Sequence, residues 1–402
     1  MSEFLLNEVC ELIVDCPHTT AKDEGEGFPL VRTPNIGKGR LVYDGMHRVC
    51  EDVYNKRNAR AIPQENDLIF AREATAGNVA LIQKGEKVCL GQRTVLIRPN
   101  QEIVNPAFLT YFLLAPKQQY NLLSTANGAT VAHVNLPTIR NLKIDLPELS
   151  TQHRIATILS RYDSLIENYQ KQIKLLEEAA QRLYKEWFVD LHFPGHESTK
   201  IVDGVPEGWE KKTINDVCTL ISSGSTPSRN KNSYWDNGTI RWVKTKELLD
   251  RWILDTEEYI PQEGYNNSST KLFPANTILM AIYASPTLGR LGILSAECCC
   301  NQAALGLIAD EKVISWQWLF WKLYELRDEF NAIARGAGQQ NISGIVVKNK
   351  EIVIPAKRVI DGFTSVVSTM FEQQKNLQSQ IRLLTEARDR LLPKLMSGEI
   401  AV

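Results

Sequence analysis

The sequence repeats itself at an interval of about 208 residues, and this repeat constrains the fold more than any other feature. The segment QIKLLEEAAQRLYK (Gln172–Lys185) matches QIRLLTEARDRLLP (Gln380–Pro393) at most positions, through identity or conservative substitution. An interval of 210 pairs Cys89–Ile97 with Cys299–Leu307 in apolar pattern. Self-similarity at this spacing indicates that one structural unit occurs twice. Each copy is interpreted as a mixed domain followed by a long helix.

Each copy ends in a segment whose apolar residues alternate at spacings of four and three, which is the heptad pattern of a helix with one continuous apolar seam. Each helix could pack on its own domain, but seams of equal length favour pairing of the two helices. Because a whole domain separates them, an antiparallel coiled coil with pseudo-two-fold symmetry is the simplest closure. The predicted seam consists of Ile155, Leu159, Tyr162, Ile166, Ile173, Leu176, Leu183, Phe363, Val367, Met370, Leu377, Ile381, Leu384 and Leu391.

Only two positions of the second seam are polar, Gln374 and Arg388. Thirty-three helical residues form a rod of roughly 50 Å. Pro393 is expected to end or kink the second helix near its last turn, because proline removes a backbone donor.

The remaining sequence predicts α+β domains on a curved, mostly antiparallel sheet. Short apolar or alternating runs, which are typical of strands, are DLIFA, VALIQ, RTVLI and LKIDLP in the first copy and NTILMAIY, LGILS and LGLIA in the second. Helices are expected in VNPAFLTYFLL and ISWQWLFWKLY. The expected divisions are a first domain at 1–150, a helix at 151–191, a linker at 192–206, a second domain at 207–356, and a helix with a tail at 357–402.

Composition excludes several classes of protein. The 46 basic and 47 acidic side chains give a net charge of −1, which is not that of a protein coating nucleic acid. No apolar run approaches the roughly 18–20 residues of a membrane span, and the N-terminus lacks signal-peptide features, so we expect a cytoplasmic protein. Among eight cysteines, the run Cys298–Cys300 suggests a metal site, but neighbouring strand residues point to opposite faces. We therefore expect no metal.

No catalytic constellation is evident. The segment NPAF at Asn105 is similar to the N-P-P-[YF] loop of amino-methyltransferases, yet its repeat equivalent is Ser315, which favours a helix N-cap at both places. Asp190 near Glu210 imitates a nuclease motif across a linker, and His192 lacks further ligands of suitable spacing. Glycine-rich nucleotide loops are missing from the sequence. A binding protein is therefore favoured over an enzyme.

Basic residues are concentrated in comparable places of the two copies. Residues 31–60 carry seven Lys and Arg against three acidic residues, and residues 229–251 carry six against three. Thr33 corresponds to Thr245 at an interval of 212. Clustered Arg and Lys with Ser, Thr and Asn suit contacts to phosphates and base edges. From charge alone, a solvated face explains the pattern equally well.

Several motifs resemble the specificity subunit of Type I restriction-modification systems. They are LPELSTQHRIATILSRYDSLIE at the start of the first helix, RLYKEWFVDLHFPG at its end, VPEGWEKKTINDVCTLISSGSTPSRNKNSYW and RWVKTKEL in the second domain, and RDRLLPKLMSGEI at the C-terminus. The likeness covers the whole chain in the family's order. The interior of the first domain resembles the family least.

This resemblance implies two target-recognition domains that each read one half of a bipartite DNA site. The paired helices would set the gap between the half-sites, and a rod of roughly 50 Å suits half-sites about one helical turn apart. They would also bind two modification (methyltransferase) subunits, with or without restriction subunits. S-adenosylmethionine, ATP and Mg²⁺ are then expected on those partners, with no cofactor in this chain, which would be a non-catalytic part of an adenine-N6 methyltransferase.

The loops supply the candidate DNA-binding residues. They are Arg32, Thr33, Lys38, Arg40, Arg72, Asn78, Thr130 and His133 in the first domain, and Thr226, Ser228, Arg229, Lys231, Lys244, Thr245, Gln339, Gln340 and Asn341 in the second. His133 aligns with Asn341, and both side chains can hydrogen-bond a base. Two rival hypotheses are a self-contained DNA methyltransferase or nuclease, which would need a cofactor loop, and a coiled-coil adaptor that binds only protein.

Overall fold

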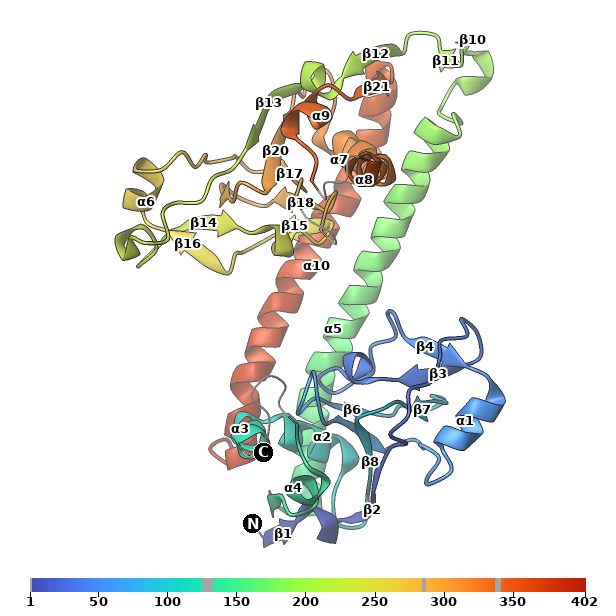
Figure 1. Cartoon of the computed structure of the whole chain (residues 1–402), viewed down its shortest axis with the longest axis vertical. Helices are drawn as coiled ribbons and strands as arrows, with labels where there is room; N and C mark the ends of the chain where they lie inside the picture. Colours follow the sequence, from blue (N-terminus) through green and yellow to red (C-terminus); the bar gives the residue numbers. More distant parts are fainter. Residues whose placement is uncertain (1, 125–132, 284–286, 337–340) are drawn as a thin grey trace. The chain divides into compact units, whose positions relative to one another are not determined.

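The computed structural model describes residues 2–124, 133–283, 287–336 and 341–402 (Figure 1). The chain forms two compact units. Unit 1 comprises Met1–Ile166 and Leu383–Val402, and unit 2 comprises Glu167–Arg382. Each unit therefore holds one repeated domain together with a part of each long helix. In the described ranges, no helix combines the length and the apolar character needed to cross a bilayer.

Unit 1 is built on a four-stranded antiparallel sheet of order β2-β8-β5-β6. Beside it are a three-stranded sheet of order β4-β3-β7, in which β3 and β7 are parallel, and the antiparallel pair β1-β9. The strands are β1 (Ser2–Leu5), β2 (Cys10–Asp15), β3 (Phe28–Val31), β4 (His47–Val49), β5 (Leu68–Ala71), β6 (Val79–Leu81), β7 (Cys89–Leu90), β8 (Thr94–Pro99) and β9 (Lys143–Leu146). The shorter helices are η1 (Leu6–Glu8), η2 (Thr33–Asn35), α1 (Glu51–Arg57), α2 (Pro106–Leu114), α3 (Pro116–Ser124) and α4 (Leu136–Arg140).

Unit 2 repeats this strand order. The sheet β13-β20-β17-β18 corresponds strand by strand to β2-β8-β5-β6 and gains β15 at its edge, parallel to β18. The small sheet β16-β14-β19 and the pair β12-β21 repeat the rest. The strands are β12 (Glu210–Thr213), β13 (Cys218–Ser223), β14 (Ile240–Val243), β15 (Arg251–Ile253), β16 (Glu258–Ile260), β17 (Ile278–Ala281), β18 (Leu291–Leu294), β19 (Cys299–Cys300), β20 (Ala304–Ala309) and β21 (Glu351–Ile354). The shorter helices are η5 (Ile214–Val217), η6 (Asn232–Tyr234), η7 (Thr245–Glu247), α6 (Gln262–Asn266), α7 (Trp316–Glu325), α8 (Arg327–Gly336) and α9 (Gly344–Lys348).

The predicted fold class is confirmed, and the seven segments expected to be strands all contain one. The central strands β5 and β17 are buried along their whole length. This explains their continuous apolar sequences, because a strand covered on both faces needs no polar alternation.

Helix capping at the repeat-equivalent positions is also confirmed. The Asn105 side chain accepts a hydrogen bond from the backbone N–H of Phe108 at 2.9 Å. The Ser315 hydroxyl accepts one from Trp318 N–H at 3.2 Å. Each satisfies a donor that the first turn of α2 or α7 leaves free. The NPAF segment is therefore a helix start.

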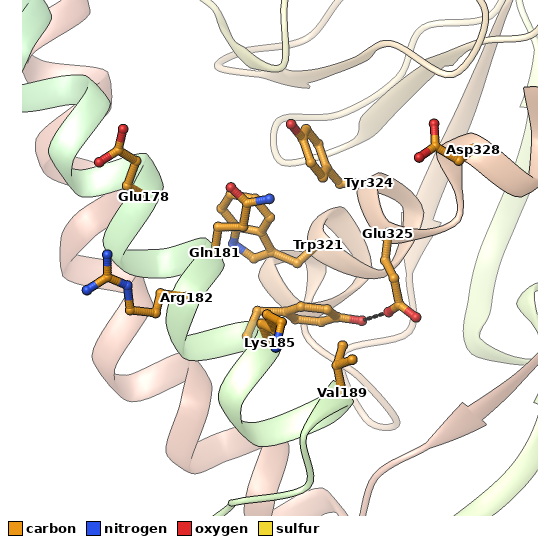
Figure 2. A pocket seen from close by; sticks show the side chains of 10 residues that line it. Glu178, Gln181, Arg182, Lys185, Val189, Trp321, Tyr324, Glu325 and Asp328 are labelled. Atoms are coloured by element: carbon orange, nitrogen blue, oxygen red, sulfur yellow. Dashed lines mark hydrogen bonds between the residues drawn. The ribbon is translucent and has the colours of Figure 1, made fainter.

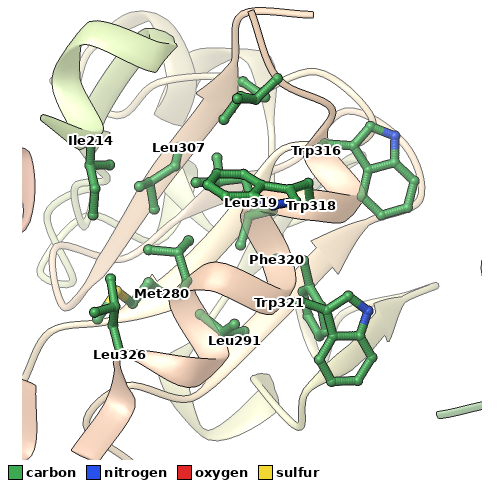
Figure 3. Close-up of a cluster of buried hydrophobic side chains, with 14 of the residues drawn as sticks. Ile214, Met280, Leu291, Leu307, Trp316, Trp318, Leu319, Phe320, Trp321 and Leu326 are labelled. Carbon is green, nitrogen blue, oxygen red and sulfur yellow. The ribbon is translucent and has the colours of Figure 1, made fainter. Parts of the chain in front are cut away.

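The core of unit 2 lies between its large sheet and α7 (Figure 3). The aromatic face of α7 supplies Trp318, Phe320 and Trp321, while the sheet supplies Met280 and Leu307. Unit 1 has the equivalent core, in which Phe108 and Phe112 of α2 pack on the sheet. Burial of these large side chains provides most of the driving force for folding.

The two long helices are α5 (Leu149–Tyr184), which continues into a π-helical turn, η3 (Lys185–Val189), and α10 (Lys357–Ser397). In unit 1 the beginning of α5 packs with the end of α10, and in unit 2 the end of α5 packs with the beginning of α10. The helices are therefore paired antiparallel in each unit (Figure 1).

Each domain core takes side chains from both helices. In unit 1, Ile155 and Leu159 of α5 join Leu392 and Leu395 of α10 in the core. In unit 2 the roles are exchanged, with Phe363 and Val367 of α10 joined by Ala180 and Tyr184 of α5. Packing of each helix on its own domain and pairing of the two helices, which the sequence left as alternatives, therefore both occur. A helix packs on its own domain where it begins and on the other copy's domain where it ends.

The predicted seam residues are all buried or half-buried. Off the seam, Leu175 at 65% and Leu383 at 58% are exposed, whereas Tyr184 and Phe371, which face a domain, are buried. Of the two polar seam positions, Gln374 is 5% exposed, and Arg388 forms an ion pair with Asp163 at 2.6 Å. Helix α10 continues through Pro393 and ends within the next turn, at Ser397.

The segment between the repeats contains the short antiparallel pair β10 (Ile201–Val202) and β11 (Val205–Pro206) and the 3-10 turn η4 (His196–Ser198). Within the second domain, Cys298 and Cys300 lie in one apolar cluster while Cys299 lies in another. The three thiols thus alternate between faces as expected. Burial raises the pKa of Cys298 to about 12 and that of Cys299 to about 11.

Candidate nucleic-acid interface

The predicted basic segments occupy the same place in the two domains. In both segments the central strand of the small sheet, β3 or β14, is followed by a short 3-10 turn, η2 or η7. The residue before each turn donates its backbone N–H to a side chain three positions on, from Arg32 to Asn35 at 3.2 Å and from Lys244 to Glu247 at 2.7 Å. Thr33 and Thr245 therefore start equivalent turns, as their alignment predicted.

In the first domain, several candidate residues support this loop. The Arg32 guanidinium donates to the carbonyl of Gly45 at 3.0 Å. Thr33 is 8% exposed, and its carbonyl accepts a hydrogen bond from the Thr75 hydroxyl at 2.8 Å. The Asn78 amide donates to the Ile36 carbonyl at 2.9 Å. The hydrogen bonds to the Thr33 and Ile36 carbonyls thus fix the conformation of the loop.

The next two candidates lie near the long helices. Lys38 is exposed and lines a hollow with Asp163 and Arg388. The Arg40 guanidinium donates to the Ser164 hydroxyl of α5 at 3.4 Å. Lys38 therefore remains accessible to a ligand, whereas Arg40 helps to hold the loop against α5.

A charged network lies at the ends of β2 and β5. The Arg72 guanidinium donates to Asp15 at 2.8 Å and to the Val134 carbonyl at 2.9 Å, and lies 2.9 Å from His133 Nε2. The His133 Nδ1 lies 2.7 Å from Glu73. Arg72 is 8% exposed. The donors of Arg72 therefore face protein partners and hold the His133 ring, and a direct DNA contact of Arg72 stays a prediction.

Glu73 extends this network to the surface through an ion pair with Arg93 at 2.7 Å. Arg93 is 54% exposed and has a backbone φ of 66°, in the left-handed region that non-glycine residues rarely adopt. Sequence reasoning missed Asp15, Glu73 and Arg93. For Arg93, the GQRT sequence after β7 indicated a turn, but it did not indicate a role for the arginine.

The backbone around this network is conserved between the repeats although its side chains are not. Val134 N–H donates to the Arg72 carbonyl at 3.0 Å, and Ile342 N–H donates to the Ile282 carbonyl at 3.0 Å. Ile282 therefore stands where the first domain has Arg72. The same backbone position thus carries a charged arginine in one domain and an apolar isoleucine in the other.

In the second domain, Arg229 lies over the face of Trp235, with its guanidinium carbon 3.4 Å from the ring centroid. It also pairs with Glu258 at 2.6 Å. Trp235 in turn donates its indole N–H to the Ser228 carbonyl at 3.2 Å. Stacking of this kind holds a guanidinium in a fixed plane. The loop from Ser228 to Trp235 therefore presents a preorganised cation.

The other second-domain candidates are also held by neighbours. The Thr226 hydroxyl donates to Gln302, and Lys231 donates to the Tyr234 hydroxyl at 3.0 Å. The hydrogen bond with Tyr234 raises the pKa of Lys231.

Two glutamates balance the charge of Lys244. Its ammonium lies 2.7 Å from Glu258 and 3.1 Å from Glu257. The hydrogen bond with Glu258 raises the pKa of Lys244. Burial raises the pKa of Glu258, but hydrogen bonds from Lys244 and Arg229 outweigh it and lower the value overall. The Lys244 and Glu258 side chains are half-buried, at 23% and 29% exposure, whereas Glu257 is 53% exposed.

Three candidates, Thr130, Gln339 and Gln340, lie outside the described residues. Asn341 lies within the described residues, is exposed, and forms an isolated antiparallel β-bridge with Tyr283. It therefore lies where His133 lies in the first domain, as the alignment predicted.

The weak catalytic signals have local structural explanations. Asp190 pairs with Lys185 at 2.5 Å, and His192 lies 3.1 Å from Glu186. Within the described ranges, no group of three or more His, Cys, Asp or Glu side chains is arranged to hold a metal ion.

The repeated frame and its paired loops match a known family. The family model of the Type I restriction modification DNA specificity domain matches the chain twice, at residues 1–178 and at residues 206–381. The chain belongs to this family. The two matches correspond to the two repeats, so each copy of the structural unit is one specificity domain.

Relatives in the specificity-domain family are similar along most of the chain. The MjaIX Type I restriction enzyme specificity subunit of Methanocaldococcus jannaschii is 26% identical, over 96% of this chain and 90% of its own length. The HindI specificity subunit of Haemophilus influenzae is 25% identical, over 76% of this chain and 80% of its own length. The Type I system S subunit from M. genitalium shares the fold, with a TM-score of 0.62 and 14% identity over 98% of this chain and 95% of its own.

Proposed function

We propose that this chain is the DNA specificity subunit of a Type I restriction-modification complex, in which each specificity domain reads one half of a bipartite site. The observation that carries the proposal is the double match of the specificity-domain family to two domains that share one backbone frame. Their loops carry different side chains at equivalent positions. Two copies of one frame with different loops suit the reading of two different half-sites.

The loop chemistry supports DNA as the ligand. Arg229 is stacked and preorganised, while His133 and Asn341 occupy equivalent positions and can hydrogen-bond base edges. Arg32 and Lys244 begin equivalent turns and suit phosphate contacts. A protein-only adaptor would leave these paired basic loops without a purpose.

We further propose that two methyltransferase subunits bind at repeat-equivalent hollows. In unit 2, a hollow of about 560 Å³ lies between the end of α5 and α7, and Figure 2 shows Trp321, Tyr324 and Gln181 around it. The hydroxyl of Tyr184, another lining residue, donates to Glu325 at 2.5 Å. Burial raises the pKa of Tyr184, which keeps this hydroxyl protonated as a donor.

The hollow in unit 1, about 200 Å³, shares four lining positions of the repeat with the hollow in unit 2. Tyr111, Leu114, Asp389 and Leu392 line it where Trp321, Tyr324, Gln181 and Tyr184 line the first. Repeat-related surfaces within one chain suit two copies of one partner, as isologous surfaces do in symmetric oligomers. The repeat therefore accounts for a pair of identical partner subunits.

In this proposal the catalytic groups belong to the partners. The methyltransferase subunits would bind S-adenosylmethionine and methylate adenine at N6, and a restriction subunit, where present, would use ATP and Mg²⁺. This chain would contribute DNA recognition and assembly in the cytoplasm.

The test is to co-purify this chain with the methyltransferase subunit encoded beside it and to map N6-methyladenine in a host genome that is otherwise free of methylation. A bipartite motif with a fixed gap is the expected result. A complex that forms but methylates no defined motif would contradict DNA recognition by this chain. Methylation by the chain without a partner would support the rival enzyme hypothesis.

A further inference from the structure

A positively charged hollow of about 200 Å³ lies on unit 1, beside the loop that begins at Arg32. Three arginines line it, namely Arg32, Arg57 and Arg93. Its other polar lining residues are Thr20, Thr33 and Gln92. Among the described residues, none that lines this hollow is acidic. The hollow therefore combines cations and neutral polar groups, which is the donor set for an anion.

Arg57 is the buried base of the hollow. It is 5% exposed, and its guanidinium donates to the carbonyls of Leu90 at 2.5 Å, Thr19 at 2.9 Å and Pro17 at 3.4 Å. Within the described part of the chain, Arg57 forms hydrogen bonds to carbonyls and no ion pair. Carbonyl oxygens satisfy hydrogen bonds but do not neutralise a full charge, and a buried charge without a counter-ion is unfavourable. The site is therefore short of one negative charge.

The other two arginines stand closer to solvent. Arg32 donates from Nη2 to the Gly45 carbonyl, while its Nε is buried and has no hydrogen-bond partner. Arg93 is 54% exposed and pairs with Glu73 on the network side. Its left-handed backbone conformation is of a kind that persists at functional sites when surrounding contacts enforce it.

The second domain differs in charge balance at the equivalent place. The hydrogen bond from Thr20 to Gln92 recurs as the one from Thr226 to Gln302, so the frame is the same. Lys244, which stands where the first domain has Arg32, has two glutamates beside it. In the second domain two glutamates, which also pair with Arg229 and Lys246, thus lie beside the lysine, whereas no acidic residue among the described ones lines the hollow of the first domain.

We infer that this hollow binds one phosphate of the DNA backbone beside the half-site read by the first domain. The inference rests on the proposed function and adds to it a phosphate anchor on one domain. Arginines bind phosphate oxygens through paired, charge-assisted hydrogen bonds. Such contacts position a protein on the duplex without reading its sequence. The anchor fixes the register at which His133 meets the bases.

The first experiment measures DNA affinity against salt concentration for the complex with its methyltransferase subunits. Removing one phosphate contact lowers the magnitude of the slope of log K against log salt by about 1. We expect this loss for Arg32→Gln on cognate and non-cognate DNA alike, and a wild-type slope for Arg32→Lys, which keeps the charge. Arg48→Gln is the matched control, because Arg48 is exposed, lies on nearby β4 and does not line the hollow.

The second experiment identifies the phosphate. Neutral methylphosphonate is placed at one backbone position at a time across the first half-site. One position should weaken binding of the wild-type complex about as much as Arg32→Gln does, and should have no further effect on that variant. The same positions in the second half-site should not show this non-additivity with Arg32→Gln.

Three outcomes would overturn the inference. Arg32→Gln could keep the wild-type slope, or lose affinity on cognate DNA alone, which would indicate a base contact. Inorganic phosphate could stabilise the free chain against thermal unfolding while no methylphosphonate position is non-additive, which would indicate a site for a free anion. A wild-type complex that methylates a bipartite motif, combined with any of these results, leaves the proposed function intact. Absence of a motif contradicts both.

Discussion

Three equivalent positions of the repeat are polar in unit 1 and apolar in unit 2. In unit 1 they hold Tyr111 of α2, Asp163 of α5 and Arg388 of α10. The Tyr111 hydroxyl donates to Asp163 at 2.5 Å, and Arg388 pairs with the same carboxylate at 2.6 Å. Burial raises the pKa of Tyr111, so its hydroxyl remains a donor. A charged, hydrogen-bonded group thus joins the two long helices to the domain.

In unit 2 the same positions hold Trp321, Phe371 and Ala180, all buried. The rings of Trp321 and Phe371 lie 6.4 Å apart, and Ala180 leaves room for them. The comparison shows that the space between the domain and the two helices must be filled in both units, either by polar side chains that bond to one another or by apolar side chains. The polar arrangement depends on each partner being present, whereas the apolar one depends on volume.

The largest expected effect is on the apolar side. Phe371→Ala opens a cavity in the core of unit 2 and should lower the free energy of unfolding by about 4 kcal/mol, measured by chemical denaturation. The matched control is Val366→Ala on the same helix, where the side chain is 44% exposed and the change should stay within about 0.5 kcal/mol. Equal effects of the two substitutions would show that Phe371 does not hold the helices to this core.

The polar side should respond to loss of one partner. Arg388→Met leaves Asp163, whose side chain is 10% exposed, without its counter-ion, and should cost about 3 kcal/mol of unfolding free energy. Replacing both residues, as Arg388→Met with Asp163→Leu, should cost less than the sum of the single changes.

The control for this pair is Arg390→Met, because Arg390 is 78% exposed in its ion pair with Glu386. Its effect should be under about 1 kcal/mol. Strict additivity in the double variant would mean that the ion pair does not couple the helices.

Substitutions in the two domains should also affect recognition of different half-sites. His133→Ala should relax the motif in one half-site and Asn341→Ala in the other, each by about 1–3 kcal/mol of discrimination between bases. The measurement is the genome-wide map of methylated adenines for each variant complex. Relaxation of the same half-site by both substitutions would contradict the assignment of one half-site to each domain.

The smallest expected effect concerns the internal counter-ions of the second domain. Glu258→Gln should change unfolding free energy by less than about 1 kcal/mol, yet raise DNA affinity, because Lys244 and Arg229 lose a competing anion. Because the pKa of Glu258 is lowered, the native pairs persist on acidification until the pH falls through that lowered value. Filter binding at several salt concentrations measures the gain, and weaker DNA binding would contradict this role.

Much of the frame could be predicted from the sequence because it depends on local patterns. Apolar runs indicated the central strands, the heptad spacing indicated the faces of α5 and α10, and Asn105 and Ser315 indicated helix starts. Charge counts predicted where basic residues gather. They could not predict which of those residues remain available, because Arg72 acquires its partners from segments distant in sequence and Lys244 acquires Glu258 from the neighbouring strand β16.

The sequence by itself therefore determined that one α+β unit with a long helix occurs twice, since repeats, periodicity and capping are properties of neighbouring residues. Only the tertiary structure decided that each long helix ends in the core of the other copy's domain, because periodicity defines an apolar face but not what covers it. The charge balance was decided in the same way. Arg57 of the first domain lacks a counter-ion among the described residues, and Lys244 of the second has two, because the folding of the chain, and not its composition, selects which charges meet.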